Sequence, residues 1–256
     1  MTARTLVDYD RLWQVLGAES EVLAVSVRGA RVESVIPGCP GLTLGEAARH
    51  VGSQYRMIWQ WLRDGRRPGN WQREPAAGQE LADYIRSGAA PILAELAAHQ
   101  PDEPCPTWWQ EEQHYGFWRR RLAHETTVHR YDVQGAAGMI PDEVPDDIAL
   151  DGIDEVLTLW FGHRLDVLGV SGTRDQVVAV QAAELEWLTR AGIEHTSTHR
   201  PGDPNDGAVT VDATVSGSPM EIYLWLWGRR PDRAVDMDGN QDAIAQLWAL
   251  LRLATR

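Results

Sequence analysis

Glu125 and His129 are the two residues whose types and spacing most clearly suggest a chemical function, because a carboxylate and an imidazole lie four positions apart. Steps of three and four residues return to one face of a helix, so the pair shares a predicted stripe with Trp118, Leu122 and Val133. Ionisable groups are unfavourable on an apolar stripe, since a buried carboxylate is destabilising unless it is paired or binds a metal. The spacing suits one metal ion held by ligand bonds of roughly 2.0–2.2 Å. The pair therefore indicates a metal centre.

The same pair also fits a polar core without a metal. Glu125 has Arg121 one helical turn before it, and His129 has Asp132 three residues after it as a hydrogen-bonding partner. Paired buried charges occur in proteins without metals. Spacing alone leaves both interpretations open.

Two ligands rarely hold a metal ion tightly, so a third is expected from another helix. His50 is the best candidate, because it shares a predicted helical face with Met57 and Trp61 and so points toward apolar surroundings. With Glu125 and His129 it would form a His₂Glu set that leaves a coordination position open. Such a set is typical of catalytic rather than structural zinc.

The other histidines are weaker candidates. His124 lies five residues before His129, which separates the two by ~140° around a helix of ~3.6 residues per turn. The run is therefore HExxxH, and the zinc-protease motif HExxH is excluded. His195 and His199 would lie ~13 Å apart on a strand that rises ~3.3 Å per residue, too far to share an ion. Isolated histidines, expected to be surface or structural residues, are His99, His114 and His163.

Composition sets broad limits on the protein and its partners. The chain has 256 residues, 43% hydrophobic and 24% charged, typical of a globular protein with one large domain or two of ordinary size. A net charge of −13 argues against a nucleic-acid partner, which needs a basic face. The N-terminal residues show no signal-peptide pattern, and the longest apolar run, residues 222–227, is too short to span a membrane. We therefore expect a cytoplasmic protein with neither a nucleic-acid nor a membrane partner, of unknown oligomeric state.

Cysteine and lysine offer no convincing nucleophile. Cys39 and Cys105 each lie in a proline-flanked loop, form no CxxC pair and have no neighbour in the sequence that would lower a thiol pKa. All 24 basic residues are arginine. Schiff-base and lysine general-base chemistry is therefore excluded.

Helical periodicity dominates the first part of the chain. Four helices are predicted, over residues 8–27, 43–62, 78–99 and onward from 107. The second and fourth are predicted to begin at capping boxes, Thr43 with Glu46 and Thr107 with Gln110. Four helices of this length predict a four-helix bundle, whose metal sites are built from side chains of different helices.

The pattern changes near residue 172, after a fifth predicted helix over residues 148–168. The expected elements are strands over 177–180, 184–190, 193–199 and 209–215, a turn cluster over 201–207, and helices over 218–227 and 240–254. We therefore expect an α+β protein. A four-helix bundle would form a first domain, residues 1–170, and a small α+β unit a second, residues 171–256.

Two segments resemble the signatures of the mycothiol-dependent maleylpyruvate isomerase family: PGCPGLTLGEAARHVG at residues 37–52 and RRLAHETTVHRYD at residues 120–132. Residues 209–230, VTVDATVSGSPMEIYLWLWGRR, are similar to the C-terminal domain of that family. The resemblance spans nearly the whole chain. It implies a DinB-like N-terminal bundle and a sterol-carrier-like C-terminal domain. One departure is Leu42, where members often carry tryptophan.

The resemblance also implies a cofactor and a chemistry. In the family, a zinc ion is held by a histidine of the second helix and by a glutamate and a histidine of the fourth, roles that fall on His50, Glu125 and His129. An arginine of the C-terminal domain serves the active site, and Arg229 or Arg230 is the candidate here. Zinc would bind mycothiol or a similar thiol and favour its thiolate, the true nucleophile. The thiolate would add to an activated double bond, as in cis–trans isomerisation, or displace a leaving group.

Arg130, beside His129, is another candidate for substrate binding. The positions one turn away on its predicted face hold Thr126 and Val133, so no acidic residue of its own helix pairs with it. An arginine can bind a substrate carboxylate through two parallel hydrogen bonds, but it can also be a solvated surface charge. The sequence leaves both interpretations open.

Three functions are consistent with these observations. The leading prediction is a zinc-dependent isomerase or S-transferase that uses mycothiol or a similar thiol and acts on a small, carboxylate-bearing molecule. The second is a non-catalytic module whose tryptophan-rich residues 222–227 help to bind an apolar ligand, although such a stripe is more often core. The third is a hydrolase in which the metal activates water. A thiol requirement separates the first from the third.

Overall fold

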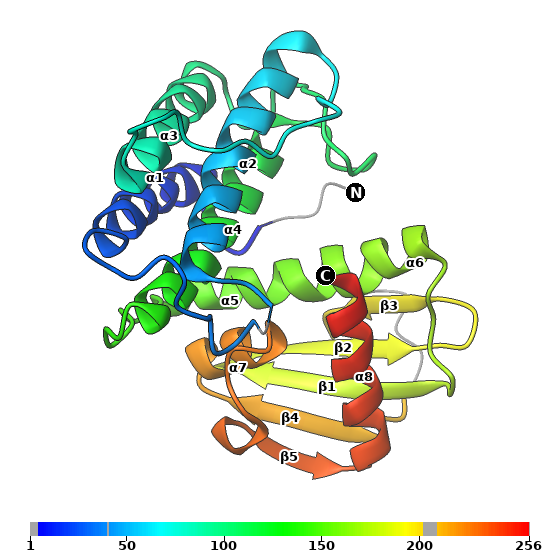
Figure 1. The fold of residues 1–256 in the computed structure, drawn as a ribbon. Helices are drawn as coiled ribbons and strands as arrows, with labels where there is room; N and C mark the ends of the chain where they lie inside the picture. Colours follow the sequence, from blue (N-terminus) through cyan, green and yellow to red (C-terminus); the bar gives the residue numbers. More distant parts are fainter. Residues whose placement is uncertain (1–4, 40, 202–208, 256) are drawn as a thin grey trace. The chain divides into compact units, whose positions relative to one another are not determined.

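The computed structural model describes residues 5–39, 41–201 and 209–255. Contacts divide the chain into two compact units, Met1–Glu143 and Val144–Arg256. The first unit is helical, and the second combines helices with a sheet (Figure 1). The predicted fold class, a four-helix region followed by an α+β part, is confirmed.

Four long helices build the first unit. They are α1 (Tyr9–Ser26), α2 (Leu44–Asp64), α3 (Leu81–Ala98) and α4 (Tyr115–Ala136). α1 packs against α3 and α4, and α2 also packs against both. Each helix turns a row of apolar side chains inward, including the fully buried Leu12, Ile58, Ile92 and Leu122. The bundle therefore brings residues of α2 and α4 close together across a common core.

The predicted capping box at the start of α2 is present. Thr43 Oγ1 accepts from the backbone N–H of Glu46 at 3.3 Å, and Glu46 Oε2 accepts from the Thr43 N–H at 2.8 Å. These bonds satisfy backbone donors that have no partner inside the helix. The cap fixes where α2 begins and hence the turn that carries His50.

The predicted start of the fourth helix is wrong. α4 begins at Tyr115, with His114 as its N-cap residue, rather than near Thr107. The Thr107 hydroxyl donates to the carbonyls of Trp109 and Glu112 and accepts from the Trp109 N–H, so it closes a turn within the loop. The Thr107–Gln110 spacing matched a capping box because threonine stabilises turns through the same kind of local hydrogen bond.

Close contact between α2 and α3 depends on glycine. A side chain at Gly88 would meet the Arg56 guanidinium and approach the carbonyl oxygen of Gly52 to 2.9 Å. Arg56 occupies this space because it donates to the carbonyls of Gly52 and Tyr84, at 2.6 and 2.8 Å. The helices α2 and α3 can therefore approach each other closely only because Gly52 and Gly88 have no side chain.

Replacing Gly88 by alanine is expected to lower the free energy of unfolding by about 1–3 kcal/mol, the usual effect of overpacking. Urea unfolding would measure the change. Gly69→Ala is the matched control, because a side chain there meets no atom within 4 Å and the residue lies in a loop. Equal stability of the two variants would contradict the close packing of α2 against α3.

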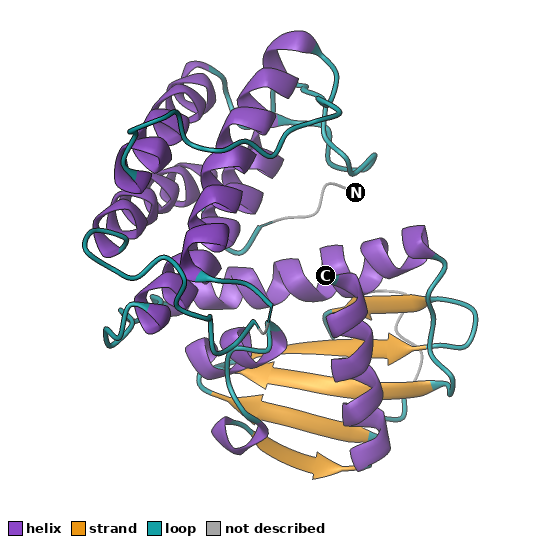
Figure 2. Cartoon of the chain, viewed as in Figure 1, coloured by secondary structure: helices purple, strands orange, loops and turns teal. Residues whose placement is uncertain are grey.

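The second unit is built around a five-stranded mixed sheet (Figure 2). Its strands are β1 (Gln176–Ala182), β2 (Leu185–Ala191), β3 (Thr196–His199), β4 (Ala213–Gly217) and β5 (Asp236–Gly239), in the order β3-β2-β1-β4-β5. β1 and β4 are parallel, and the other neighbours are antiparallel. The helical elements are α5 (Asp146–Glu155), the π-helix η1 (Val156–Arg164), α6 (Leu165–Leu168), α7 (Pro219–Leu226), the 3₁₀ turn η2 (Asp232–Ala234) and α8 (Gln241–Ala254).

Two predictions for this sheet differ from the structure. β4 starts at Ala213, so Val209 and Val211 precede it and are each 39% exposed. β5 was not predicted, because its residues are mostly polar and exposed and carry no buried alternation. In the predicted turn cluster over 201–207, residues 202–207 lie outside the described residues.

The segment over residues 144–170 belongs with the sheet by its contacts. α5 packs against α7, η1 packs against β3 and α8, and Trp187 Nε1 donates to Asp154 Oδ1 at 2.9 Å. The contact boundary at Glu143 therefore falls earlier than the domain boundary proposed from the sequence, after residue 170. The sequence could not show this, because a helix that covers a sheet has the same periodicity as a helix in a bundle.

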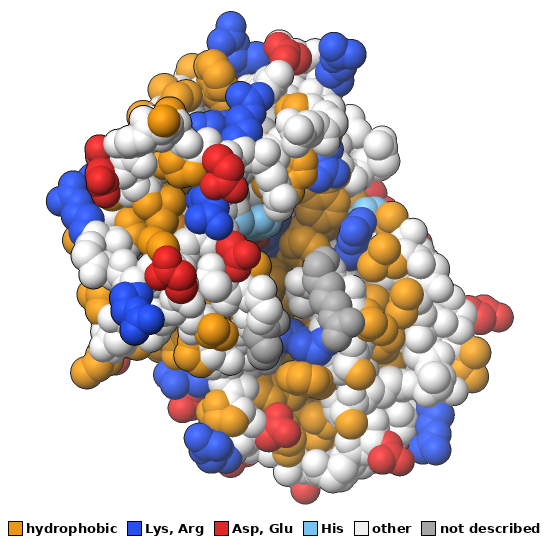
Figure 3. Space-filling view, viewed as in Figure 1, with side chains coloured by type: hydrophobic (Ala, Val, Ile, Leu, Met, Phe, Trp, Pro, Cys, Tyr) orange, Lys and Arg blue, Asp and Glu red, His pale blue; other side chains and the backbone are white. Residues whose placement is uncertain are grey.

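On the face shown in Figure 3, acidic and basic residues are interspersed rather than gathered in one patch. Among the described helices, none combines the length and apolar character that crossing a membrane requires.

Candidate metal centre

The structure brings the predicted trio together inside the first unit. His50 comes from α2, and Glu125 and His129 come from α4. Each residue offers one ligand atom, and these atoms all lie within 4.8 Å of one another. Glu125 Oε1 lies 3.1 Å from His50 Nε2 and 3.3 Å from His129 Nε2. The three atoms thus face a common point.

The outer atoms of α4's two site residues are held by neighbours on the same helix. Arg121 Nη2 donates to Glu125 Oε2 at 2.9 Å, and His129 Nδ1 lies 3.4 Å from Asp132 Oδ2. Both contacts were part of the metal-free interpretation of the sequence. They use only the atoms that face away from the trio. The polar core and the metal site are therefore compatible, because the neighbours orient the residues and leave Oε1 and Nε2 for a cation.

The donor set fits a metal ion chemically. Two imidazole nitrogens and one carboxylate oxygen are ordinary zinc ligands. His50 Nε2 and Glu125 Oε1 approach to 3.1 Å, and two lone pairs at that distance need a proton or a cation between them. The side chains of Glu125 and His129 are only 12% and 11% exposed, so little water is present to compensate.

The pKa values of Glu125 and His129 also indicate that positive charge stabilises this cluster. Burial raises the pKa of Glu125, but the hydrogen bonds with His129 and His50 and the charge of Arg121 outweigh it, and the pKa lies well below its usual range. Burial lowers the pKa of His129, but the carboxylates of Asp132 and Glu125 outweigh burial and raise it to about 9. Without a metal, a proton on His129 therefore balances the two acids.

Zinc binding is expected to release this proton. Below the His129 pKa of about 9 a zinc ion must displace the proton, so the apparent affinity should rise with pH. One released proton corresponds to about tenfold tighter binding per pH unit. Competition with a chromophoric chelator between pH 6.5 and 8 would measure the slope for protein first stripped of metal. An affinity that is independent of pH would show that His129 does not compete with the metal for its nitrogen.

Two neighbours of the trio were missed by sequence reasoning. Gln54, one turn after His50 on α2, places its Nε2 atom 2.6 Å from Glu125 Oε1 and 2.8 Å from His50 Nε2. The indole of Trp71 lies edge-on against the His50 ring, with 5.5 Å between ring centroids. The i, i+4 spacing from His50 was a usable signal for Gln54, whereas Trp71 lies in a loop and carried none.

The remaining histidines lie outside the trio. His124 is fully buried in α4, and His195 is exposed in the turn before β3. His99 lies between the carboxylates of Glu95 and Glu103, at 3.5 and 2.8 Å. These contacts are those of a structural residue, as expected from the sequence.

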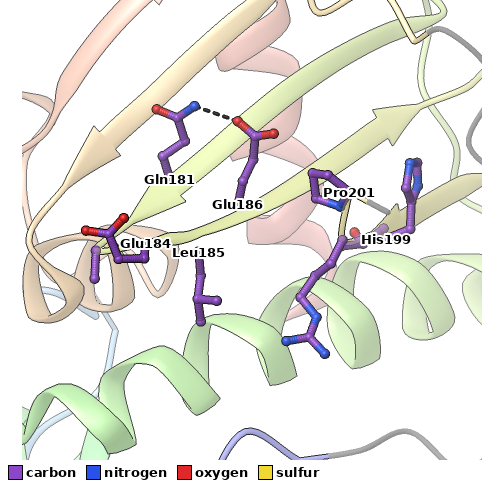
Figure 4. Close-up of a pocket in the computed structure, with 9 residues that line it drawn as sticks. Gln181, Glu184, Leu185, Glu186, His199 and Pro201 are labelled. Carbon is purple, nitrogen blue, oxygen red and sulfur yellow. Dashed lines mark hydrogen bonds between the residues drawn. The ribbon is translucent and has the colours of Figure 1, made fainter. Parts of the chain in front are cut away.

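His199 of β3 lines a pocket of about 870 Å³ at the end of the β1–β2 hairpin (Figure 4). Gln181 of β1 and Glu186 of β2 are neighbours across the two strands, and Gln181 Nε2 donates to Glu186 Oε2 at 2.5 Å (Figure 4). All the residues that line the pocket belong to the second unit, whereas the trio belongs to the first.

Both interpretations of Arg130 are wrong. Its side chain is 1% exposed, and its Nε donates to Glu19 Oε2 of α1 at 2.6 Å. Nη1 also donates to Gln134 Oε1 and to the carbonyl of Asp142, at 3.1 and 2.6 Å. Arg130 is therefore neither a solvated surface charge nor a group available to a substrate, because a buried ion pair holds it.

The two candidate arginines of the C-terminal part follow α7 in the second unit. Arg229 and Arg230 are half-buried, and Arg229 Nη1 donates to the Trp227 carbonyl at 2.6 Å. Neither belongs to the unit that carries the trio.

Burial raises the pKa of the Cys105 thiol to about 12, which agrees with its exclusion as a nucleophile.

The fold and the site together define a class of protein: a four-helix unit with an inward-facing His₂Glu cluster, joined to an α+β unit. Residues 14–134 match the mycothiol maleylpyruvate isomerase N-terminal domain, and residues 147–246 match the C-terminal domain of the same family. The chain belongs to the mycothiol-dependent maleylpyruvate isomerase family.

Solved structures agree on the fold. The crystal structure of the mycothiol-dependent maleylpyruvate isomerase matches with a TM-score of 0.63 at 12% identity, over 93% of this chain and 97% of that chain. A histidine-to-alanine mutant of that enzyme matches with a TM-score of 0.59 at 11% identity, over the same shares of the two chains. Comparison with curated proteins found no match.

Proposed function

We propose that this protein is a zinc-dependent enzyme that uses a low-molecular-weight thiol, mycothiol by the name of its family, as cofactor or co-substrate. It would act as an isomerase or an S-transferase on a small molecule that carries a carboxylate. One observation carries the proposal: Glu125 Oε1 and the Nε2 atoms of His50 and His129 face one point.

Three residues would hold the metal, and two would orient them. His50, Glu125 and His129 would supply the ligand atoms, while Arg121 and Asp132 fix the carboxylate and the imidazole on α4 from the outer side. When bound, zinc supplies a Lewis acid that binds a thiol and favours its thiolate form. His₂Glu sets with an open position are typical of catalytic zinc.

The protein's own side chains would limit the remaining chemistry to binding and orientation. The chain has no lysine, and its two free cysteines lie in loops, Cys39 before α2 and Cys105, whose thiol has a pKa of about 12, before α4. The nucleophilic sulfur would therefore come from the thiol. Arg229 or Arg230 would bind the carboxylate of the substrate, since a guanidinium fork matches a carboxylate through two parallel hydrogen bonds. Which of the two acts is decided by comparing the KM values of the two alanine variants.

The test begins with metal content and continues with turnover. Elemental mass spectrometry should find about one zinc per chain in the wild type and none in His129→Ala. The matched control, His195→Ala, changes an exposed histidine of the second unit and should retain zinc. The zinc-loaded wild type is then screened for conversion of unsaturated or activated carboxylates with and without thiol.

Each result has a defined meaning. Conversion that requires the thiol supports the proposal, and conversion without thiol favours a hydrolase in which zinc activates water. A folded wild type that takes up no metal when zinc is supplied would refute the proposal and favour a binding module without catalysis.

A further inference from the structure

We propose that Gln54 is a fourth metal-binding group, which coordinates the ion through its amide oxygen until a thiol displaces it. The inference rests on the proposed function, because it needs a metal held by His50, Glu125 and His129. It adds a residue that the trio does not include. It also gives the site a means of selecting its incoming ligand.

The position of the carboxamide is the first observation. Gln54 lies on α2 one turn after His50, and its Nε2 atom lies 2.8 Å from His50 Nε2 and 2.6 Å from Glu125 Oε1. A zinc ion would lie roughly 2.0–2.2 Å from these same two atoms. The end of the Gln54 side chain therefore lies where the ligand atoms of α2 and α4 converge.

The hydrogen-bonding chemistry shows why this amide is suited to the site. An amide NH₂ group presents two donors, and one of them is donated to Glu125 Oε1 at 2.6 Å. The same nitrogen lies 2.8 Å from His50 Nε2, which itself lies 3.1 Å from Glu125 Oε1. The end of the Gln54 side chain is therefore held against both ligand atoms.

Rotation of the amide exchanges a hydrogen-bond donor for a metal ligand. The NH₂ group cannot coordinate a metal, because its nitrogen lone pair is delocalised into the carbonyl. The terminal torsion of glutamine is broad and roughly two-fold, so a half-turn exchanges the NH₂ and the C=O in nearly the same place. The oxygen, which has two acceptor lone pairs, then faces the ion.

A neutral oxygen in this position would influence what binds next. Glutamine adds no charge, so the ion keeps the net charge that a His₂Glu set leaves it. Zinc prefers soft thiolate sulfur to a carbonyl oxygen, so a thiol can displace Gln54. Water is also an oxygen ligand and has no such advantage over the amide. Gln54 would therefore favour a thiol over water at the open position.

Cobalt substitution tests the inference without an activity assay. Co²⁺ is loaded into wild type, Gln54→Ala and the matched control Gln60→Ala, and the visible d–d absorption is recorded before and after a thiol is added. Gln60 lies further along α2, where it contacts Asp64 and Arg73 at 3.3 Å each, outside the trio. Zinc affinity is measured in parallel by chelator competition, and circular dichroism checks that each variant is folded.

Gln54→Ala is expected to change the cobalt spectrum of the thiol-free protein and to weaken zinc binding by about tenfold or more, as loss of a group beside a metal does. Gln60→Ala should match the wild type in both measurements. After thiol addition, Gln54→Ala and wild type should give the same spectrum, because the amide has been displaced. Gln54→Glu keeps an oxygen and should retain zinc.

The failures of the two proposals are distinguishable. If wild type and Gln60→Ala bind zinc and Gln54→Ala has the same affinity and spectrum, Gln54 is not a ligand, and the metal site itself stands. If folded wild type binds neither zinc nor cobalt, the proposed function and the role of Gln54 both fail.

Discussion

Replacing Glu125 by glutamine is expected to abolish zinc retention and, with it, thiol-dependent turnover. Glutamine matches glutamate in size, so the packing of α4 is kept and only the charge is lost. Glu125 Oε1 is the central atom of the trio, at 3.1 Å from one imidazole nitrogen and 3.3 Å from the other. Loss of a residue that merely surrounds a metal weakens binding by about 10–100-fold, so loss of the only anionic ligand should exceed the upper end of that range.

Dialysis against a chelator followed by elemental mass spectrometry would measure the change. Glu111→Gln is the matched control, because it removes the same charge from an exposed position in the loop before α4. Equal zinc retention by both variants would contradict the prediction. It would instead favour the metal-free interpretation, a polar core in which Glu125 is only the partner of Arg121 and His129.

The trio was predictable because an α-helix has a fixed period. Glu125 and His129 stand out in the sequence as polar residues on an apolar stripe, and His50 stands out on α2 for the same reason. The carboxamide of Gln54 was not singled out, because an uncharged amide is common on helices and costs less to bury than a charge. Asp132 was also expected from its spacing as the partner of His129, and the structure places His129 Nδ1 3.4 Å from Asp132 Oδ2.

The partner of Arg130 could not be predicted from the sequence. Its partners on its own helix face are uncharged, and its actual partner, Glu19, lies 111 residues earlier in the chain. No local pattern connects the two residues. The pairing depends on how α1 packs against α4, which is a property of the tertiary structure.

The fold was predicted where elements are long and periodic. The bounds of α1, α2 and α3 follow the apolar spacing closely, and two of their starts are fixed by the side chains of Asp8 and Thr43. Short elements were less predictable, because a four-residue strand such as β5 contains only two residues on each face. The π-helical hydrogen bonding of η1, Val156–Arg164, carries no apolar signature that distinguishes it from an α-helix.

Breaking the ion pair between Glu19 and Arg130 is expected to destabilise the helical unit strongly. The Arg130 side chain is 1% exposed and that of Glu19 is 14% exposed, and the Nε–Oε2 distance is 2.6 Å. Removing one partner of a buried pair typically lowers the free energy of unfolding by about 3–5 kcal/mol, because the other charge is left without compensation. Glu19→Gln and Arg130→Met are therefore both expected to be strongly destabilised in urea.

Glu21→Gln is the matched control for Glu19→Gln, because both residues lie on α1 and pair with an arginine. Glu21 pairs with Arg86 at 2.5 Å, but its side chain is 56% exposed. Water screens such a pair, so its loss should change stability far less than the loss of the buried pair. Equal effects of Glu19→Gln and Glu21→Gln would contradict the burial of Arg130.

The double variant, Glu19→Gln with Arg130→Met, separates the effect of losing the ion pair from the effect of leaving one buried charge without a partner. If the main penalty of each single change is an uncompensated buried charge, removing both charges should restore much of the stability, and the effects will not add. Zinc affinity, measured on the same proteins while they are folded, should stay within error of the wild type, because the Arg130 side chain is directed to Glu19, Gln134 and Asp142 and not to the trio. A loss of zinc without a loss of stability would instead assign Arg130 to the metal centre, against its burial beside Glu19.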